Sequence, residues 1–178
     1  LTDATLNANL GNPIDWYRDA NSLLVKMLPA NRPALVDTKN AIPAGPVISV
    51  SDGTVSQNRT YQDMLKNPGD EANFVTLTTS ELYQVKLDGS KTLYKPAGMY
   101  AGTAFSPDGN LLMVTTFNKP FSYIVPLNRF PQLTVVYDLQ GKELKKIADL
   151  PLAEVMPKGF MAVAKGMRAI NWRSDEPA

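Results

Sequence analysis

Apolar and polar residues alternate along most of the chain, and turn residues separate the alternating stretches. The clearest case is the segment 81–87, which Asp88-Gly89 links to a return strand at 91–94 as a two-residue hairpin. The same pattern predicts further short strands, at residues 13–16, 23–28, 99–105, 111–116, 133–138 and 143–147. The pattern therefore predicts an all-β fold of antiparallel strands.

An aromatic residue stands three positions before an aspartate three times in the chain. The copies are Trp16-Tyr17-Arg18-Asp19, Phe105-Ser106-Pro107-Asp108 and Trp172-Arg173-Ser174-Asp175, and an apolar strand follows each of the first two. Repeated short antiparallel units of this kind are typical of propeller blades, which take roughly 40–45 residues each. The copies here lie further apart because irregular segments separate their strands.

We therefore predict a partial β-propeller of about two four-stranded antiparallel blades plus the start of a third. The blades are expected at 13–95 and 99–147, and the inner strand of the next blade at 166–172. Residues 1–178 are then expected to be a fragment of one propeller domain. A single antiparallel sandwich or barrel is the main alternative, and the recurrence of the same turn argues against it.

The repeated aspartates have a structural explanation that needs no chemistry. An Asp in a tight turn accepts hydrogen bonds from the backbone amides of that turn, and Gly109 supplies a permissive backbone after Asp108. Asp19, Asp108 and Asp175 are predicted to be structural turn residues rather than calcium or substrate ligands. The aromatic residue before each of them is expected to pack between adjacent blades.

A long insertion, residues 28–79, interrupts the first predicted blade. It contains Pro29, Pro33, Pro43 and Pro46 among small and polar residues, a composition that opposes both helix and central strand. Only 60–67 resembles a helix, with Thr60 as N-cap and apolar residues at helical spacing. We predict a short helix there that ends at Pro68-Gly69.

Composition excludes several kinds of chemistry. The 178-residue chain has no Cys and no His, so it cannot form a Ser-His-Asp or Cys-His arrangement, a disulfide or a His- or thiolate-ligated metal site. It also has no Gly-x-Ser-x-Gly nucleophile elbow. We predict no catalytic residue, no metal and no cofactor. A net charge of +1 argues against nucleic-acid binding, and short apolar runs argue against a membrane span.

Three longer stretches carry a family resemblance. They are Arg59-Thr60-Tyr61-Gln62-Asp63-Met64-Leu65, then Lys119-Pro120-Phe121-Ser122-Tyr123-Ile124-Val125-Pro126 with Arg129-Phe130-Pro131, then Asp149-Leu150-Pro151-Leu152-Ala153-Glu154 followed by Lys165-Gly166-Met167-Arg168-Ala169-Ile170-Asn171-Trp172-Arg173. In this order they resemble the propeller region of serine peptidases of the prolyl oligopeptidase family (S9). The resemblance is greatest to the glutamyl endopeptidase branch.

The resemblance implies that substrate access and catalysis belong to two different domains. Members of the family join a β-propeller, which restricts access to peptides, to a C-terminal α/β-hydrolase domain that holds the catalytic triad. None of the triad motifs has a counterpart in this chain. The resemblance therefore implies a non-catalytic N-terminal propeller segment whose partners are that hydrolase domain and peptide substrates. The alternative is a stand-alone propeller-like module that binds proteins or peptides.

Two arginines are candidate substrate-binding residues under this resemblance. In an enzyme that cleaves after glutamate, Arg129 or Arg168 could hold the substrate carboxylate through paired hydrogen bonds. The alternative for both residues is a structural role in ion pairs or in hydrogen bonds to loop carbonyls.

Aromatic residues and strand edges suggest further contacts. Four aromatic residues lie in a second insertion, between the predicted strands 111–116 and 133–138: Phe117, Phe121, Tyr123 and Phe130. They could form a lip for a peptide, contact the hydrolase domain, or pack on their own blade. Strand edges left open predict self-association of the chain.

Overall fold

The computed structural model describes residues 4–37, 61–155, 167 and 169–174, and these form two four-stranded antiparallel sheets. The first sheet contains β1 (Ile14–Trp16), β2 (Ser22–Met27), β3 (Ser80–Lys86) and β4 (Lys91–Gly98). The second contains β5 (Tyr100–Phe105), β6 (Leu111–Phe117), β7 (Gln132–Asp138) and β8 (Glu143–Leu150). An α-helix, α1 (Pro68–Thr78), precedes β3, and a 3₁₀ turn, η1 (Leu127–Arg129), precedes β7.

Each sheet is a simple meander, in which every strand pairs with its neighbours in sequence. No described strand passes from one sheet to the other, as Greek-key connections of a sandwich would require, and the described strands close no barrel. The structure thus confirms the predicted all-β, partial propeller-like fold. The sheets extend over residues 14–98 and 100–150, whereas the ranges predicted for the blades are 13–95 and 99–147.

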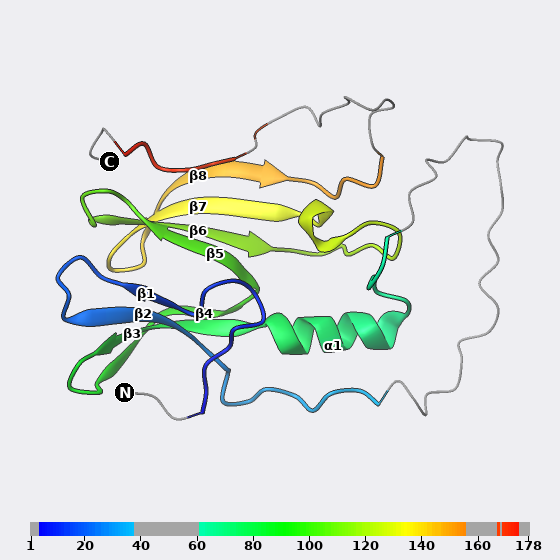
Figure 1. Ribbon diagram of the computed structural model, residues 1–178, viewed down its shortest axis with the longest axis horizontal. Coiled ribbons are helices and arrows are strands. Elements are labelled where there is room, and N and C mark those ends of the chain that lie inside the picture. Colours follow the sequence, from blue (N-terminus) through cyan, green and yellow to red (C-terminus); the bar gives the residue numbers. More distant parts are fainter. Residues whose placement is uncertain (1–3, 38–60, 156–166, 168, 175–178) are drawn as a thin grey trace.

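The antiparallel order gives the molecule two different ends. The β1–β2, β3–β4, β5–β6 and β7–β8 connections are short and lie together at one end, which we call the turn end (Figure 1, left). The helix α1 and the loop that contains η1 lie at the opposite end, which we call the insertion end (Figure 1, right). Long connections therefore elaborate only one end of the two sheets within the described part of the chain.

The aspartates of the repeated signature hold the turns that follow β1 and β5. Asp19 Oδ1 accepts a hydrogen bond from the Asn21 amide at 2.9 Å, and Asp108 Oδ1 accepts one from the Asn110 amide at 3.1 Å. The Ser106 hydroxyl also donates to Asp108, and this bond, followed by those from Asn110, lowers the pKa of the Asp108 carboxyl. Both aspartates thus occupy the predicted turn positions, whereas Asp175 lies outside the described residues.

Gly109 is required by its neighbour as well as by its backbone. Its φ is +75°, in the left-handed region, and a Cβ added there would lie 2.6 Å from the Cβ of Arg18 on the β1–β2 turn. Gly89, in the β3–β4 hairpin, has a φ of +86° and would meet nothing within 4 Å. An alanine at either position would strain the backbone, but only an alanine at Gly109 would also clash with the other sheet. Comparing the two substitutions therefore separates these two costs.

We expect Gly109→Ala to destabilise the chain more than Gly89→Ala. Each variant should lose about 1–2 kcal/mol through its left-handed backbone, and only Gly109→Ala adds the clash with Arg18. Urea unfolding of both variants measures the difference. In an Arg18→Gly background, which lacks the clashing side chain, adding Gly109→Ala should cost only about as much as Gly89→Ala costs in the original chain. Equal losses for both single variants would contradict the proposed contact.

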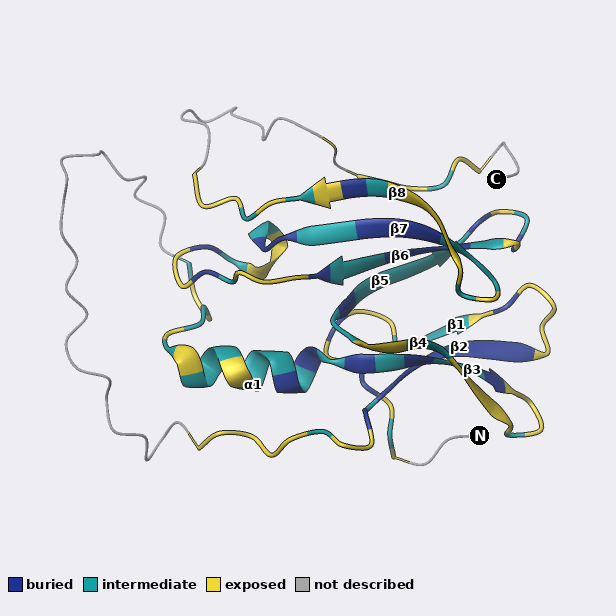
Figure 2. Ribbon diagram, turned by 180° about the vertical axis from the view of Figure 1, so that it is seen from behind, coloured by how far each residue is buried: buried dark blue, intermediate teal, exposed yellow. Residues whose placement is uncertain are grey.

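An apolar layer joins the two sheets. Its centre is Leu24, Leu82, Leu112 and Val114, each 0–2% exposed, with β2 buried along its whole length (Figure 2). The rings of Tyr17 and Phe105 meet there with their centroids 4.8 Å apart. The aromatic residue of the second copy thus packs between the sheets as predicted. In the first copy Tyr17 takes this place and Trp16 stays 58% exposed, because successive residues of a strand face opposite sides.

Hydrogen bonds between the sheets run mostly from side chains of the first sheet to main-chain carbonyls of the second. Arg18 donates to the Pro107 carbonyl at 2.6 Å, Tyr94 to that of Asp138 at 2.7 Å and Lys95 to that of Gly141 at 2.7 Å. The exception joins two side chains, with the Thr103 hydroxyl donating to Asp15 at 2.5 Å. This pattern fixes how the second sheet is placed against the first.

The predicted helix at 60–67 is wrong. Thr60 lies outside the described residues, residues 61–67 contain no helical turn, and α1 begins at Pro68 instead. Asn67 is the N-cap, because its side chain accepts a hydrogen bond from the Asp70 amide at 2.9 Å. Proline suits the first helical turn, where its missing N–H would be unpaired, and Asp70 and Glu71 complement the helix dipole there. Pro68-Gly69 therefore starts a helix rather than ending one.

The third copy of the signature is only partly described. Residues 166 and 168 lie outside the described part of the predicted strand 166–172, and 167 and 169–172 are not in a strand. The Trp172 indole donates to the Ala104 carbonyl of β5 at 2.9 Å, so this segment reaches an edge strand of the second sheet. The start of a third blade remains a prediction, as does self-association through strand edges. Among the described residues, no helix has the length and apolar character to cross a membrane.

Candidate functional site at the insertion end

Three segments that are far apart in the sequence meet at the insertion end. The guanidinium carbon of Arg129 lies 5.9 Å from the centroid of the Tyr61 ring. The Ala153 amide donates to the Arg129 carbonyl at 3.0 Å, which joins the loop after β8 to η1. These contacts bring together parts of the stretches 59–65, 119–131 and 149–154, which carry the family resemblance. We call this group, together with α1, the insertion cluster.

Aromatic side chains form the interior of the insertion cluster. Phe74 of α1 meets Phe121 and Phe130 edge-on, with ring centroids 5.1 and 5.9 Å apart, and Phe121 stacks on Phe130 at 5.2 Å. Phe130 and Phe117 are only 4% and 7% exposed. Of the predicted aromatic group, three members thus pack inside their own insertion, and Tyr123 remains 40% exposed at the surface.

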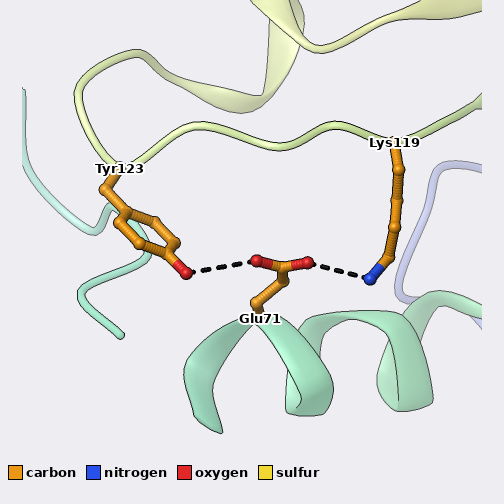
Figure 3. A network of polar contacts seen from close by, with 3 residues as sticks. All are labelled: Glu71, Lys119 and Tyr123. Atoms are coloured by element: carbon orange, nitrogen blue, oxygen red, sulfur yellow. Dashed lines mark hydrogen bonds and ion pairs between the residues drawn. The ribbon is translucent and has the colours of Figure 1, made fainter. Parts of the chain in front are cut away.

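A polar network ties α1 to the loop after β6. The carboxylate of Glu71 pairs with the Lys119 ammonium at 2.9 Å and accepts a hydrogen bond from the Tyr123 hydroxyl at 3.1 Å (Figure 3). The Lys119 hydrogen bond is the main reason why the pKa of Glu71 is lowered. Nearby, the Ser122 hydroxyl donates to Glu154 at 2.7 Å. The carboxylates of Glu71 and Glu154 are therefore both engaged by neighbouring side chains.

Arg129 is held rigidly by its backbone but lacks a partner for part of its side chain. Its amide donates to the Pro126 carbonyl at 3.0 Å, and its carbonyl accepts from Ala153. One guanidinium nitrogen, Nη1, is buried and has no hydrogen-bond partner. Among the described residues no carboxylate pairs with it. Buried polar groups are usually hydrogen-bonded, so Arg129 is the member of the cluster best placed to receive an anionic group.

The second candidate arginine cannot be compared with the first. Arg168 lies outside the described residues, so the structure does not bring it together with Arg129. No group of three potential metal-ligating side chains occurs in the described part of the chain.

Sequence reasoning missed the acidic members of the cluster. Glu71 and Glu154 were not singled out, although Glu154 belongs to one of the family-like stretches. The available signal was local: Asn67-Pro68-Gly69 followed by two acidic residues is the pattern of a capped helix start. That pattern would have placed Glu71 on the first turn of a helix, although not beside Lys119.

The fold and this cluster define a class of protein segment: a propeller-like pair of four-stranded sheets with long connections at one end. Comparison with known proteins gives a more particular result. The chain is 38% identical over 164 residues to a protein of Oryza sativa subsp. japonica named "Probable glutamyl endopeptidase, chloroplastic". It is 37% identical over 161 residues to the protein of the same name from Arabidopsis thaliana.

The two matches cover 92% and 90% of this chain but 17% of each relative, so the chain spans about a sixth of their length. They confirm the resemblance to the glutamyl endopeptidase branch that the sequence motifs indicated. No protein-family model matches the chain. No solved structure matches it either.

Proposed function

We propose that this chain is the propeller segment of a serine peptidase of the prolyl oligopeptidase family, where it controls the access of peptides to a separate α/β-hydrolase domain. The observation that carries the proposal is the 38% identity along 92% of the chain to a relative named as a glutamyl endopeptidase. The chain itself has no His and no nucleophile elbow, so the hydrolytic chemistry belongs to the rest of the parent protein.

The insertion end is the surface that we assign to this role. Parts of the three family-like stretches converge on it, and it exposes apolar side chains beside charged ones. Ile124 is 63% exposed and Leu127 is 37% exposed, next to Tyr123 in the same loop. Exposed apolar groups with polar neighbours are typical of surfaces that contact another chain or domain. We infer that residues 123–127 form a lip that faces the path of the peptide.

The role in access is tested in the full-length parent enzyme by replacing the exposed Tyr123, Ile124 and Leu127 with serine, which leaves the buried Val125 in place. Removing the lip should raise cleavage of folded proteins relative to cleavage of a short peptide, because access is less restricted. The ratio of the two rates measures the effect. Replacing Leu87, Asp88 and Ser90, the exposed residues of the β3–β4 hairpin at the turn end, is the matched control and should leave the ratio unchanged. An unchanged ratio in the lip variant would contradict the assignment.

We further propose that Arg129 binds an acidic side chain of the peptide. Its guanidinium can form paired hydrogen bonds with a carboxylate, and its buried nitrogen lacks a partner. Lys119, the other described cation of the cluster, is already paired with Glu71. The difference between these two cations supports Arg129 and supplies the control for its test.

A further inference from the structure

A cleft of about 430 Å³ lies at the turn end, opposite the insertion cluster. Both Asp turns border it, and residues of both sheets and of the β7–β8 turn line it. The polar residues of this lining include Tyr17, Asp19, Gln84, Asp108, Asn110 and Gln140. Its volume is in the range of small-ligand sites. Nothing in the proposed function uses this cleft.

The hydroxyl of Tyr17 is the first sign that the cleft holds a ligand. Tyr17 is 5% exposed, yet its hydroxyl has no hydrogen-bond partner. Tyr100, the other buried tyrosine of the same apolar layer, donates to the Pro96 carbonyl, and the partly buried Tyr94 donates to the Asp138 carbonyl. Since a buried polar group without a partner is costly, the exception calls for a group that enters from the cleft.

The charge of the lining indicates what kind of group that is. Asp19 and Asp108 contribute two carboxylates, and hydrogen bonds lower the pKa of Asp108, so that it is ionised at neutral pH. The one basic residue of the lining, Arg18, donates to the Pro107 carbonyl and forms no ion pair with either aspartate. The lining therefore carries a net negative charge.

Hydrogen-bond acceptors remain available beside these charges. Asp19 receives the Asn21 amide and the Ser22 hydroxyl on Oδ1, which leaves Oδ2 without a partner in the described structure. Gln84 donates its amide nitrogen to Ser22, which leaves its side-chain carbonyl free to accept. With the oxygen of Tyr17, these groups present acceptors to a donor with several N–H bonds.

We propose that this cleft binds the cationic end of a basic side chain of a peptide. An ammonium or guanidinium group would donate to Asp19, to the Gln84 carbonyl and to the oxygen of Tyr17, and Asp108 would stabilise its charge. The cleft is then a second recognition site, for basic peptide side chains, at the end of the molecule opposite Arg129. It does not depend on the role proposed for the insertion cluster.

The test is a titration of the 178-residue chain with N-acetyl-lysine amide and with N-acetyl-arginine amide. Backbone amide resonances of Gly109 and Asn110, which border the cleft, are followed by NMR. At least one basic probe should cause saturable shifts, and the two probes together tell an ammonium site from a guanidinium site. N-acetyl-norleucine amide, which keeps the apolar stem without the charge, should cause none.

Variants locate the site. Tyr17→Phe, Asp19→Asn and Gln84→Leu should each weaken binding by about tenfold or more, the effect of one hydrogen bond to a charged group. Asp88→Asn is the control, because Asp88 accepts the Ser90 amide at 2.8 Å in a similar turn but does not line the cleft. Amide spectra of each variant, recorded before titration, show whether it is folded. If one of the three variants does not fold, the other two still test the site.

Three outcomes would overturn the proposal. The first is the absence of saturation with both basic probes, which leaves only water as a partner for Tyr17. The second is equal binding of the norleucine probe, which shows that charge is not recognised. The third is unchanged affinity in the Tyr17, Asp19 and Gln84 variants, which places the probe elsewhere on the surface.

Discussion

Replacing Phe130 by alanine is expected to destabilise the chain by about 3–5 kcal/mol, the usual cost of removing a buried phenylalanine ring. Phe130 is 4% exposed and contacts Phe121 and Phe74, so it joins the loop after β6 to α1. The lost ring would leave a cavity where three segments of the insertion cluster meet. We expect α1 and residues 118–131 to loosen before the sheets do.

Urea unfolding measures the total loss, and hydrogen exchange shows where it falls. Amides of α1 should exchange faster in the variant, while those of β2 and β6 should keep most of their protection. Leu144→Ala is the control, because Leu144 is 49% exposed on β8 and its truncation should change stability by less than about 0.5 kcal/mol. A loss below about 1 kcal/mol in Phe130→Ala would show that the aromatic contacts do not hold the insertion end together.

Arg129→Met in the full-length parent enzyme is expected to lower kcat/KM for a peptide with glutamate at the cleavage site by about 10–100-fold. This range corresponds to losing a hydrogen-bonded contact between charged groups. A matched peptide with glutamine in place of glutamate should be affected much less. Methionine keeps the apolar stem of the arginine, so packing against Tyr61 and η1 is largely preserved.

Lys119→Met is the matched control for this variant. It removes a cation from the same cluster, but one that is 2.9 Å from the Glu71 carboxylate and therefore already neutralised. We expect it to leave the preference for glutamate over glutamine unchanged. If Arg129→Met lowers both peptides equally, Arg129 has a structural role, which is the alternative that the sequence left open.

Strands and tight turns could be predicted from the sequence because their causes are local. The Asp88-Gly89 hairpin is present between β3 and β4, and the turns at Asp19 and Asp108 have the expected hydrogen bonds. The helix was misplaced because Pro68-Gly69 has two meanings. After a helix it is a stop signal, whereas after Asn67 and before two acids it is a start.

The convergence at the insertion end could not be predicted. Arg129 was singled out for its charge, but its contact with Tyr61 joins residues 68 positions apart in the chain. Likewise, Glu71 and Lys119 meet only because both long connections leave the same end of antiparallel sheets. Such contacts follow from tertiary arrangement, about which spacing along the sequence carries no information.

The hydrogen bonds that join the two sheets have a consequence for how the amino-acid sequence can vary in evolution. Arg18, Tyr94 and Lys95 donate to carbonyl oxygens of the backbone. Every amino acid has such a carbonyl, so a substitution of the accepting residue leaves the acceptor atom in place. Pro107 or Asp138 could be exchanged without loss of the acceptor itself. Paired substitutions in related sequences would therefore leave little trace of these three contacts, even though they hold the two sheets in place against each other.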